Sequence, residues 1–374
     1  MRGTISAIFV NAVGLPINFA VQILIARLLG VSQFGNYTYV LSWVNIIVLF
    51  STLGMDSASR RYVAAYAAHG DWGALRGFMM QTSKLSALSG LFAGLMMTIM
   101  VLEISPLMSS ALSKTFFMAA VLIPVWSLSN LRVSTLRGLK QIAAARAPEF
   151  ILRPMLLAGL LWIAASLMPD NVDAPIAMFC HILASLLAFG LLSLYVHKAL
   201  PKSFFDTHPK FHTQEWLRVA LSLMLVSGFY VVLNQVDAVM IGLLSSVEEV
   251  GKYSAALKIA GLVLFGFNAV QLIAGPLLSE YYVSRSKDDL QKIASQISLL
   301  CGVLAVPAIL VVIPLGRFIL GWFGVEFESA YFCLVILAVA QVVEILIGPA
   351  SPLLIMSGKE RVVLRVLTIS FCIN

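Results

Sequence analysis

The stretch VQILIARLLGVSQFGNY, residues 21–37, has a counterpart 216 residues further along the chain in DAVMIGLLSSVEEVGKY, residues 237–253. Both end in Gly-x-Tyr, with the glycine at Gly35 in the first and at Gly251 in the second. Glycine tolerates positive φ and lets two helix ends approach closely, so each copy is predicted to form a tight hairpin of two apolar helices that turns at this glycine. The sequence therefore indicates two copies of one unit.

Composition places the chain in a membrane. Of its 374 residues, 60% are hydrophobic and only 11% are charged, and the mean hydropathy is +0.94. A soluble domain does not need so much apolar surface, so an all-α polytopic membrane protein is predicted. At about 20 residues per crossing, we expect ten spans and the start of an eleventh at residue 362: 5–29, 37–55, 78–102, 116–131, 150–167, 174–195, 217–244, 253–278, 293–312 and 331–347.

The basic residues predict the orientation. Most Lys and Arg fall on one side of the membrane when Met1 is placed inside, which predicts a cytoplasmic N-terminus. The same bias accounts for the net charge of +7. We interpret this charge as topology and attraction to anionic membrane lipids, and we expect no nucleic-acid partner.

Six spans separate the starts of the two copies, so both copies enter the membrane in the same sense. This predicts parallel repeats related by an axis along the membrane normal, enclosing a central cavity. The expected lobes are residues 1–197, with spans one to six, and residues 214–374, with spans seven to ten and the partial eleventh. Residues 198–213, which contain two prolines, several charges and no apolar run, are the expected cytoplasmic linker.

Four stretches carry a resemblance to a known family: ILIARLLGVSQFGNYTYVLSW (23–43), STLGMDSASRRYVAAY (51–66), STLRGLKQIAAARAPEFILRP (134–154) and NQVDAVMIGLLSSVEEVGKYSAALKIAG (234–261). The chain resembles the polysaccharide-biosynthesis branch of the multidrug/oligosaccharidyl-lipid/polysaccharide exporters, the Wzx-like flippases of O-antigen and exopolysaccharide units. The resemblance implies ion-coupled, alternating-access translocation of undecaprenyl-diphosphate-linked oligosaccharide across the bacterial inner membrane. It also implies partnership with the lipid-linked oligosaccharide, a polysaccharide polymerase and chain-length proteins.

Family members carry twelve or fourteen spans, and this chain departs from that number. Residues 362–374 form about 20 Å of helix, less than the bilayer core. A second lobe that is truncated is therefore expected.

Cations inside or beside spans are the candidates for binding the diphosphate. Lys258 lies more than a turn inside the eighth span and either lines the cavity or pairs with Asp237. Arg27 either contacts the anion or extends to the outer headgroups. Arg61, at the inner end of the second span, is a lesser candidate beside Asp56 and Arg60, whose spacing of four permits an ion pair.

Acids and amides within spans complete the predicted site. Asp237 either binds a coupling proton or sodium ion or is a structural partner of Lys258, and Glu344 is a second candidate for ion coupling. Asn18, Asn234 and Gln235 occupy matching depths of the two lobes, where they either contact sugar hydroxyls or, as the favoured reading, hold helices together.

The sequence contains no motif for a disulfide, a metal site, a cofactor site or a catalytic site. The four cysteines have no CxxC spacing, and His208 and His212 stand in the linker without a third ligand, so we expect no disulfide, metal or cofactor. The sequence has no phosphate loop, nucleophile elbow or catalytic carboxylate pair, and an enzyme is not expected. Two alternatives stay open: a drug or metabolite exporter of the same superfamily, and a membrane polysaccharide polymerase or ligase, although the large outer loop of such enzymes is missing.

Overall fold

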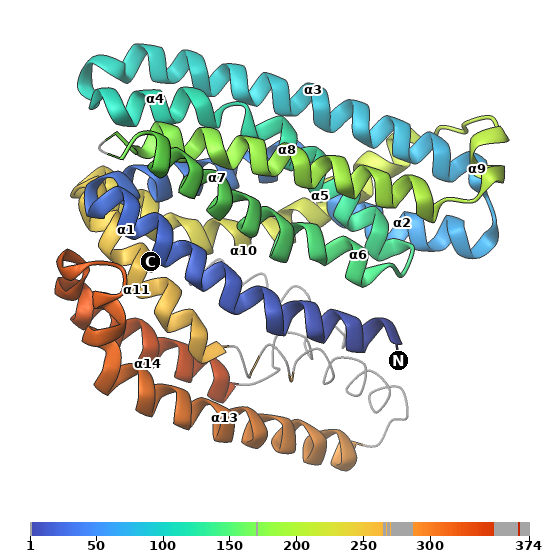
Figure 1. Cartoon of the computed structure of the whole chain (residues 1–374). Coiled ribbons are helices and arrows are strands. Elements are labelled where there is room, and N and C mark those ends of the chain that lie inside the picture. Colours follow the sequence, from blue (N-terminus) through green and yellow to red (C-terminus); the bar gives the residue numbers. More distant parts are fainter. Residues whose placement is uncertain are drawn as a thin grey trace. The chain divides into compact units, whose positions relative to one another are not determined.

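The computed structural model describes residues 2–169, 171–264, 267, 270, 287–347 and 366. These residues form helices joined by short turns, and none of them lies in a strand, which confirms the predicted all-α fold. The chain divides into two compact units, Met1–Glu248 and Glu249–Asn374, whose helices are labelled in Figure 1. The end of the predicted eighth span and, apart from residue 366, the partial eleventh lie outside the described residues.

Helix α1, Arg2–Thr52, reverses direction at Gly30. Gly30 has φ 70° and ψ 173°, a conformation that glycine adopts far more readily than other residues. Figure 1 shows the first arm of α1 leaving the N-terminus and the chain then returning to α2. The apolar stretch Phe9–Thr52 has 44 residues and, at about 20 residues per crossing, is long enough for two spans.

The turn glycine differs from the predicted one. Gly35 and Gly251 are both helical and buried, so the predictions that they form the turns and that residues 30–36 form a loop are wrong. In the second copy the backbone breaks at Ser245, with φ −128° and ψ −105°, between α10 (Thr213–Leu244) and α11 (Val247–Ala260). The helix therefore breaks close to the predicted offset in the second copy, and a glycine stands at the break only in the first copy.

The remaining helices of the first unit are α2 (Met55–His69), α3 (Trp72–Ile104), α4 (Ser110–Ala119), α5 (Leu122–Gly138), α6 (Ile142–Ala147), α7 (Arg153–Leu167), α8 (Ala174–Ala199) and α9 (Lys202–Asp206). In the described part of the chain, seven helices are long and apolar enough to cross a membrane. They coincide with the first seven predicted spans, the first two being merged in α1, and with the tenth.

Side-chain caps fix where two of these helices begin. Asp173 accepts a hydrogen bond from the N–H of Ile176 (3.0 Å) at the start of α8, and Asp71 accepts one from the N–H of Ala74 (3.1 Å) at the start of α3. The Ala74 bond, helped by Lys210, holds the pKa of Asp71 below its usual value. The α3 cap is therefore charged at neutral pH.

Helix α10 is held against α2 by aromatic and polar contacts. Trp216 is almost fully buried, meets Phe78 edge-on at 5.2 Å, and donates from Nε1 to the Tyr66 hydroxyl at 3.0 Å. The Tyr62 hydroxyl donates to Glu215 Oε1 at 3.1 Å. Burial, followed by this carboxylate, raises the pKa of Tyr62, so the phenol remains a donor at neutral pH.

The connection between the repeats is docked on α3. In this connecting segment, residues 200–212, the N–H of Lys210 donates to the carbonyl of Gly73 at 2.9 Å, and Lys210 Nζ lies 3.3 Å from Asp71 Oδ1. Arg76 donates to two carbonyl groups of the segment, at 2.5 and 2.8 Å. The first compact unit consequently extends through α10, which the repeat assigns to the second copy. The lobe boundary read from the repeat stays a prediction.

In the second unit, the described parts of α13 (Lys287–Gly321) and α14 (Tyr331–Ile347) pack side by side. The hydroxyl of Tyr331 donates to the carbonyl of Ile313 at 3.1 Å, and the guanidinium of Arg317 lies 5.1 Å from the centre of the Tyr331 ring. A Cβ on Gly316 would lie 2.9 Å from the Leu334 side chain, so a glycine lets the two helices approach closely here.

The close approach of the connecting segment to α3 predicts the effect of a methyl group. In Gly77→Ala the new Cβ would overlap the carbonyl oxygen of Lys210 and lie 2.7 Å from its carbon, so we expect a loss of about 1–3 kcal/mol of stability. Trypsin should also cleave faster after Lys210. The measurement is thermal unfolding and limited proteolysis of the purified protein. Gly159→Ala, where nothing lies within 4 Å, is the control; equal stability and cleavage in the two variants would contradict the docking.

Candidate functional site

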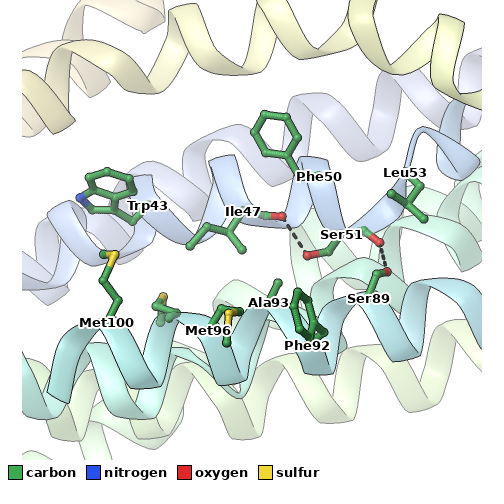
Figure 2. A pocket seen from close by; sticks show the side chains of 11 residues that line it. Trp43, Ile47, Phe50, Ser51, Leu53, Ser89, Phe92, Ala93, Met96 and Met100 are labelled. Atoms are coloured by element: carbon green, nitrogen blue, oxygen red, sulfur yellow. Dashed lines mark hydrogen bonds between the residues drawn. The ribbon is translucent and has the colours of Figure 1, made fainter. Parts of the chain in front are cut away.

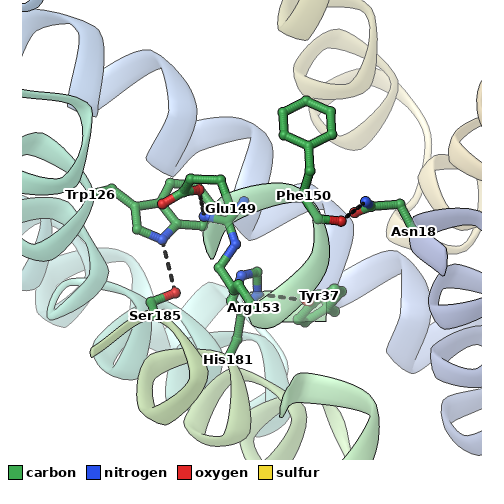
Figure 3. A network of polar contacts seen from close by, with 8 residues as sticks. All are labelled: Asn18, Tyr37, Trp126, Glu149, Phe150, Arg153, His181 and Ser185. Atoms are coloured by element: carbon green, nitrogen blue, oxygen red, sulfur yellow. Dashed lines mark hydrogen bonds and ion pairs between the residues drawn. The ribbon is translucent and has the colours of Figure 1, made fainter. Parts of the chain in front are cut away.

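A buried pair of polar rings joins α1 to α8 inside the first unit. A hydrogen bond of 2.6 Å links the Tyr37 hydroxyl with Nδ1 of His181, and both residues are buried. Figure 3 shows the pair at the centre of a wider group of polar contacts. Because Tyr37 stands seven residues after the turn at Gly30, the hairpin brings the second arm of α1 to α8.

An arginine and a carboxylate extend this network to α5 and α7. Arg153 Nη1 lies 2.7 Å from Glu149 Oε2, and its guanidinium lies 5.2 Å from the centre of the Trp126 ring. The indole Nε1 donates to Ser185 Oγ at 3.1 Å. The Arg153 and Glu149 side chains remain 25% and 18% exposed, so a solute or water can reach this ion pair.

Glu149, which carries this carboxylate, belongs to a π-helical turn, Pro148–Leu152. Such turns leave carbonyl groups without their usual partners in the helix. Here Asn18 of α1 donates to the carbonyl of Phe150 at 2.8 Å and to that of Gly14 at 2.7 Å. A Cβ on Gly14 would lie 3.0 Å from Phe150, so the absence of a side chain permits this contact. Asn18 therefore ties the first arm of α1 to the π-helical turn.

We call the side chains of Tyr37, Trp126, Glu149, Arg153, His181 and Ser185 the network. It places one cation and one carboxylate beside buried aromatic rings, within helices that are long enough to cross a membrane. Charges in such helices are costly and usually serve a function. This arrangement suits the binding of a charged group or of ions, and it contains no activated nucleophile.

A second feature is a cavity of about 510 Å³ between the second arm of α1 and α3. Figure 2 shows Trp43 and Met100 at one end and Ser51 and Ser89 near the other. Both hydroxyls donate to main-chain carbonyls, and apolar side chains form most of the wall. The volume is in the range of small-molecule pockets, and the wall suits an apolar occupant.

Three predicted site residues lie on the hairpin and the helix that follows it. Arg27 is exposed on the first arm of α1, and Arg61 is exposed on α2. Asn18 uses its amide to join helices, in agreement with the favoured reading. Arg60 donates to Ser57 Oγ at 2.9 Å and, among the described residues, makes no ion pair with Asp56, so the pairing allowed by their spacing is not formed.

The other predicted residues are distributed over both units. Asn234, Gln235 and Asp237 lie on α10, where Asn234 donates to the carbonyl of the residue four positions earlier at 2.7 Å. Lys258 on α11 and Glu344 on α14 belong to the second unit and have exposed side chains. Their roles in substrate binding and ion coupling stay predictions.

Sequence reasoning missed the network. His181 had no partner visible in the sequence, because Tyr37 lies 144 residues away. The spacing of four between Glu149 and Arg153 was the available signal, since such pairs face each other on a helix. The two flanking prolines, Pro148 and Pro154, marked the same place as irregular.

Comparisons with known proteins agree with this architecture. A family model described as "Polysaccharide biosynthesis protein" matches residues 1–281, and a second, described as MatE, matches residues 222–374. No curated protein matches the sequence.

Solved structures share the fold at low identity. An inward-facing multidrug resistance MATE family transporter of the MOP superfamily has a TM-score of 0.75 and 14% identity, over 97% of this chain and 87% of that one. A MOP superfamily transporter from Pyrococcus furiosus, whose binding pocket is described as reversed in polarity, has a TM-score of 0.60 and 16% identity, over 98% and 84%. An outward-facing multidrug resistance MATE family transporter of the MOP superfamily has a TM-score of 0.60 and 17% identity, over 98% of this chain and 84% of that one.

The apolar helices and the matches to the polysaccharide biosynthesis and MatE family models define a multi-pass membrane transporter of the MOP superfamily, and it shares its fold with MATE family transporters. Within that superfamily, the chain belongs to the polysaccharide biosynthesis protein family, whose model covers most of its length.

The buried pair of rings gives a prediction for stability. Tyr37→Phe leaves Nδ1 of His181 without its partner, and we expect a loss of about 1–3 kcal/mol. Thermal unfolding of the purified protein measures it. Tyr39→Phe is the control, because the Tyr39 ring packs against Phe116 and its hydroxyl has no hydrogen-bond partner in the described part of the chain. Equal losses in the two variants would show that the Tyr37 bond adds nothing specific.

Proposed function

We propose that the protein flips an oligosaccharide carried on undecaprenyl diphosphate from the cytoplasmic to the outer leaflet of the bacterial inner membrane, for O-antigen or exopolysaccharide assembly. The observation that carries this proposal is the match of residues 1–281 to the polysaccharide biosynthesis family. The proposal includes a cytoplasmic N-terminus. It also includes a polysaccharide polymerase and chain-length proteins as partners that use the product.

The substrate has three parts with different needs. Its diphosphate needs cations, its sugars need a wet and polar path, and its polyprenyl tail can stay in the lipid. We assign Lys258, Arg27 and Arg61 to contacts with the substrate.

In this proposal transport proceeds by alternating access, and the downhill movement of a coupling ion supplies the energy. Asp237 and Glu344 are the carboxylates assigned to the coupling ion, with Asn234 and Gln235 near the sugars. Asn18 is left out of the sugar-binding set, because its amide donates to the carbonyl of Gly14 on its own helix and to that of Phe150 in the π-helical turn.

A drug exporter is the second candidate, and one observation favours it. The cavity between α1 and α3 is apolar, and Met96, Met97 and Met100 lie on its wall. Flexible, polarizable methionines are common at surfaces that accept varied apolar ligands. Two of the solved structures with this fold are described as multidrug resistance transporters.

Deleting the gene distinguishes the two candidates. For a flippase we expect undecaprenyl-linked repeat units to accumulate in lipid extracts and surface polysaccharide to fall, with both restored by a plasmid copy. Mass spectrometry and polysaccharide gels measure these. Unchanged surface polysaccharide with no accumulation, together with greater sensitivity to lipophilic cationic dyes, would instead indicate a drug exporter.

Lys258 gives a residue-level prediction. Lys258→Ala should lower surface polysaccharide in the deletion strain at an unchanged protein level, because the diphosphate loses a cationic contact. Lys252→Ala on the same helix is the control, since Lys252 forms a surface ion pair with Glu249 at 2.8 Å, and such pairs contribute about 0–1 kcal/mol. Normal polysaccharide from Lys258→Ala would remove this residue from the site.

A further inference from the structure

Three arginines from three different helices meet at one end of the first unit. They are Arg60 of α2, Arg137 in the last turn of α5, and Arg146 of α6. A Cβ on Gly138 would lie 2.8 Å from the Cβ of Val63, so the end of α5 touches α2 one turn from Arg60. Figure 1 shows α2 and α6 at the end of the unit from which the first arm of α1 starts.

The two flanking arginines are held in place by neutral groups. Arg60 donates to Ser57 Oγ at 2.9 Å. Arg146 donates to Asn11 Oδ1, and its guanidinium lies 5.3 Å from the centre of the Phe150 ring. A hydroxyl, an amide oxygen and an aromatic face orient a guanidinium, but they leave its positive charge uncompensated.

The middle arginine, Arg137, is half-buried and has no hydrogen bond or ion pair with any residue that the structure describes. The charged groups close enough to act on it are the other two arginines and the carboxylates of Asp56 and Glu149. Glu149 already forms its ion pair with Arg153. One carboxylate, that of Asp56, therefore remains against three guanidinium groups, and the cluster carries net positive charge.

Arg137 and Arg146 are half-buried, whereas Arg60 is exposed. Like charges repel each other, and a half-buried guanidinium with unused donors is costly to desolvate. The negative end of α5 offsets only part of the charge of one arginine. The usual bias of basic residues toward the cytoplasmic side does not require burial either, since Arg61 and Lys140 in the same region are exposed. What remains is a set of preoriented donors that lacks an anion.

We propose that Arg137, flanked by Arg60 and Arg146, binds the phosphate group of a lipid. Guanidinium groups match phosphate oxygens with paired hydrogen bonds, and several arginines from different helices can surround one diphosphate. This inference rests on the proposed function and deepens it: the cluster is where the diphosphate of the lipid-linked oligosaccharide binds on the first unit. An anionic phospholipid headgroup offers the same chemistry.

The test uses the purified full chain in nanodiscs of phosphatidylcholine. Farnesyl diphosphate is the diphosphate probe, and phosphatidylglycerol introduced into the nanodisc is the phospholipid probe. We expect R137Q to weaken farnesyl diphosphate binding by about tenfold or more, the loss of a charge-assisted hydrogen bond, and R137K to retain part of it. R218Q, which changes an exposed arginine of α10 that is not among the charged groups acting on Arg137, is the matched control.

Each binding result either supports or overturns the proposed phosphate site. Loss of farnesyl diphosphate binding with an unchanged unfolding temperature supports the diphosphate site, whereas loss of phosphatidylglycerol binding alone supports a phosphate site for a membrane lipid. If R137Q lowers the unfolding temperature, R146Q is measured in its place. Unchanged affinity for both probes, or an equal loss in R218Q, overturns the proposal.

The site and the proposed function fail in different ways. If the deletion strain accumulates lipid-linked repeat units and R137Q restores export in full, the flippase stands and the site is wrong. If R137Q loses the diphosphate probe but the deletion strain has normal polysaccharide, the site stands and the flippase is wrong.

Discussion

Lipid offers no hydrogen bonds to a polypeptide backbone, and Gly30 is where the first unit meets this constraint. A loop between two crossings would leave amide and carbonyl groups unpaired close to the hydrocarbon. With φ 70° at one residue, the chain reverses while helix continues on both sides. The returning arm carries Tyr37 to α8, and it carries Trp43 and Ser51 to the wall of the cavity beside α3. The network and the cavity of the first unit thus both depend on this turn.

The fold was largely predictable because its main signals are local and repeated. Apolar runs of span length fix where helices can form, and the offset between the two Gly-x-Tyr stretches located the turn of the first copy and the helix break of the second. The sequence pointed to the wrong glycine for a physical reason. The comparison of copies favours residues that both retain, and Gly35 and Gly251 are retained as buried helical positions, whereas the counterpart of Gly30 is Ser246.

The candidate site was less predictable because its contacts join distant parts of the chain. Asn11 and Arg146 are 135 residues apart, and Asn18 and Phe150 are 132 apart. The sequence showed the arginines of α5 and α6 as a topology signal, and no local pattern revealed which of them are compensated. Arg153 has a carboxylate and the face of Trp126, whereas Arg146 has an amide and the face of Phe150. These neighbours look alike in hydrogen bonding but differ by a full unit of charge, so the charge of Arg153 is compensated and that of Arg146 is not.

The docked connecting segment has a mechanical consequence for a protein built from two repeats. Because Trp216 is buried against α2 and the residues before it are bonded to α3, the opening helix of the second repeat is anchored to the first. The helical path is next interrupted at Ser245, the residue that follows α10. The docked segment 200–212 thus fixes α10 to the first repeat, and the break at Ser245 lets the chain change direction after it.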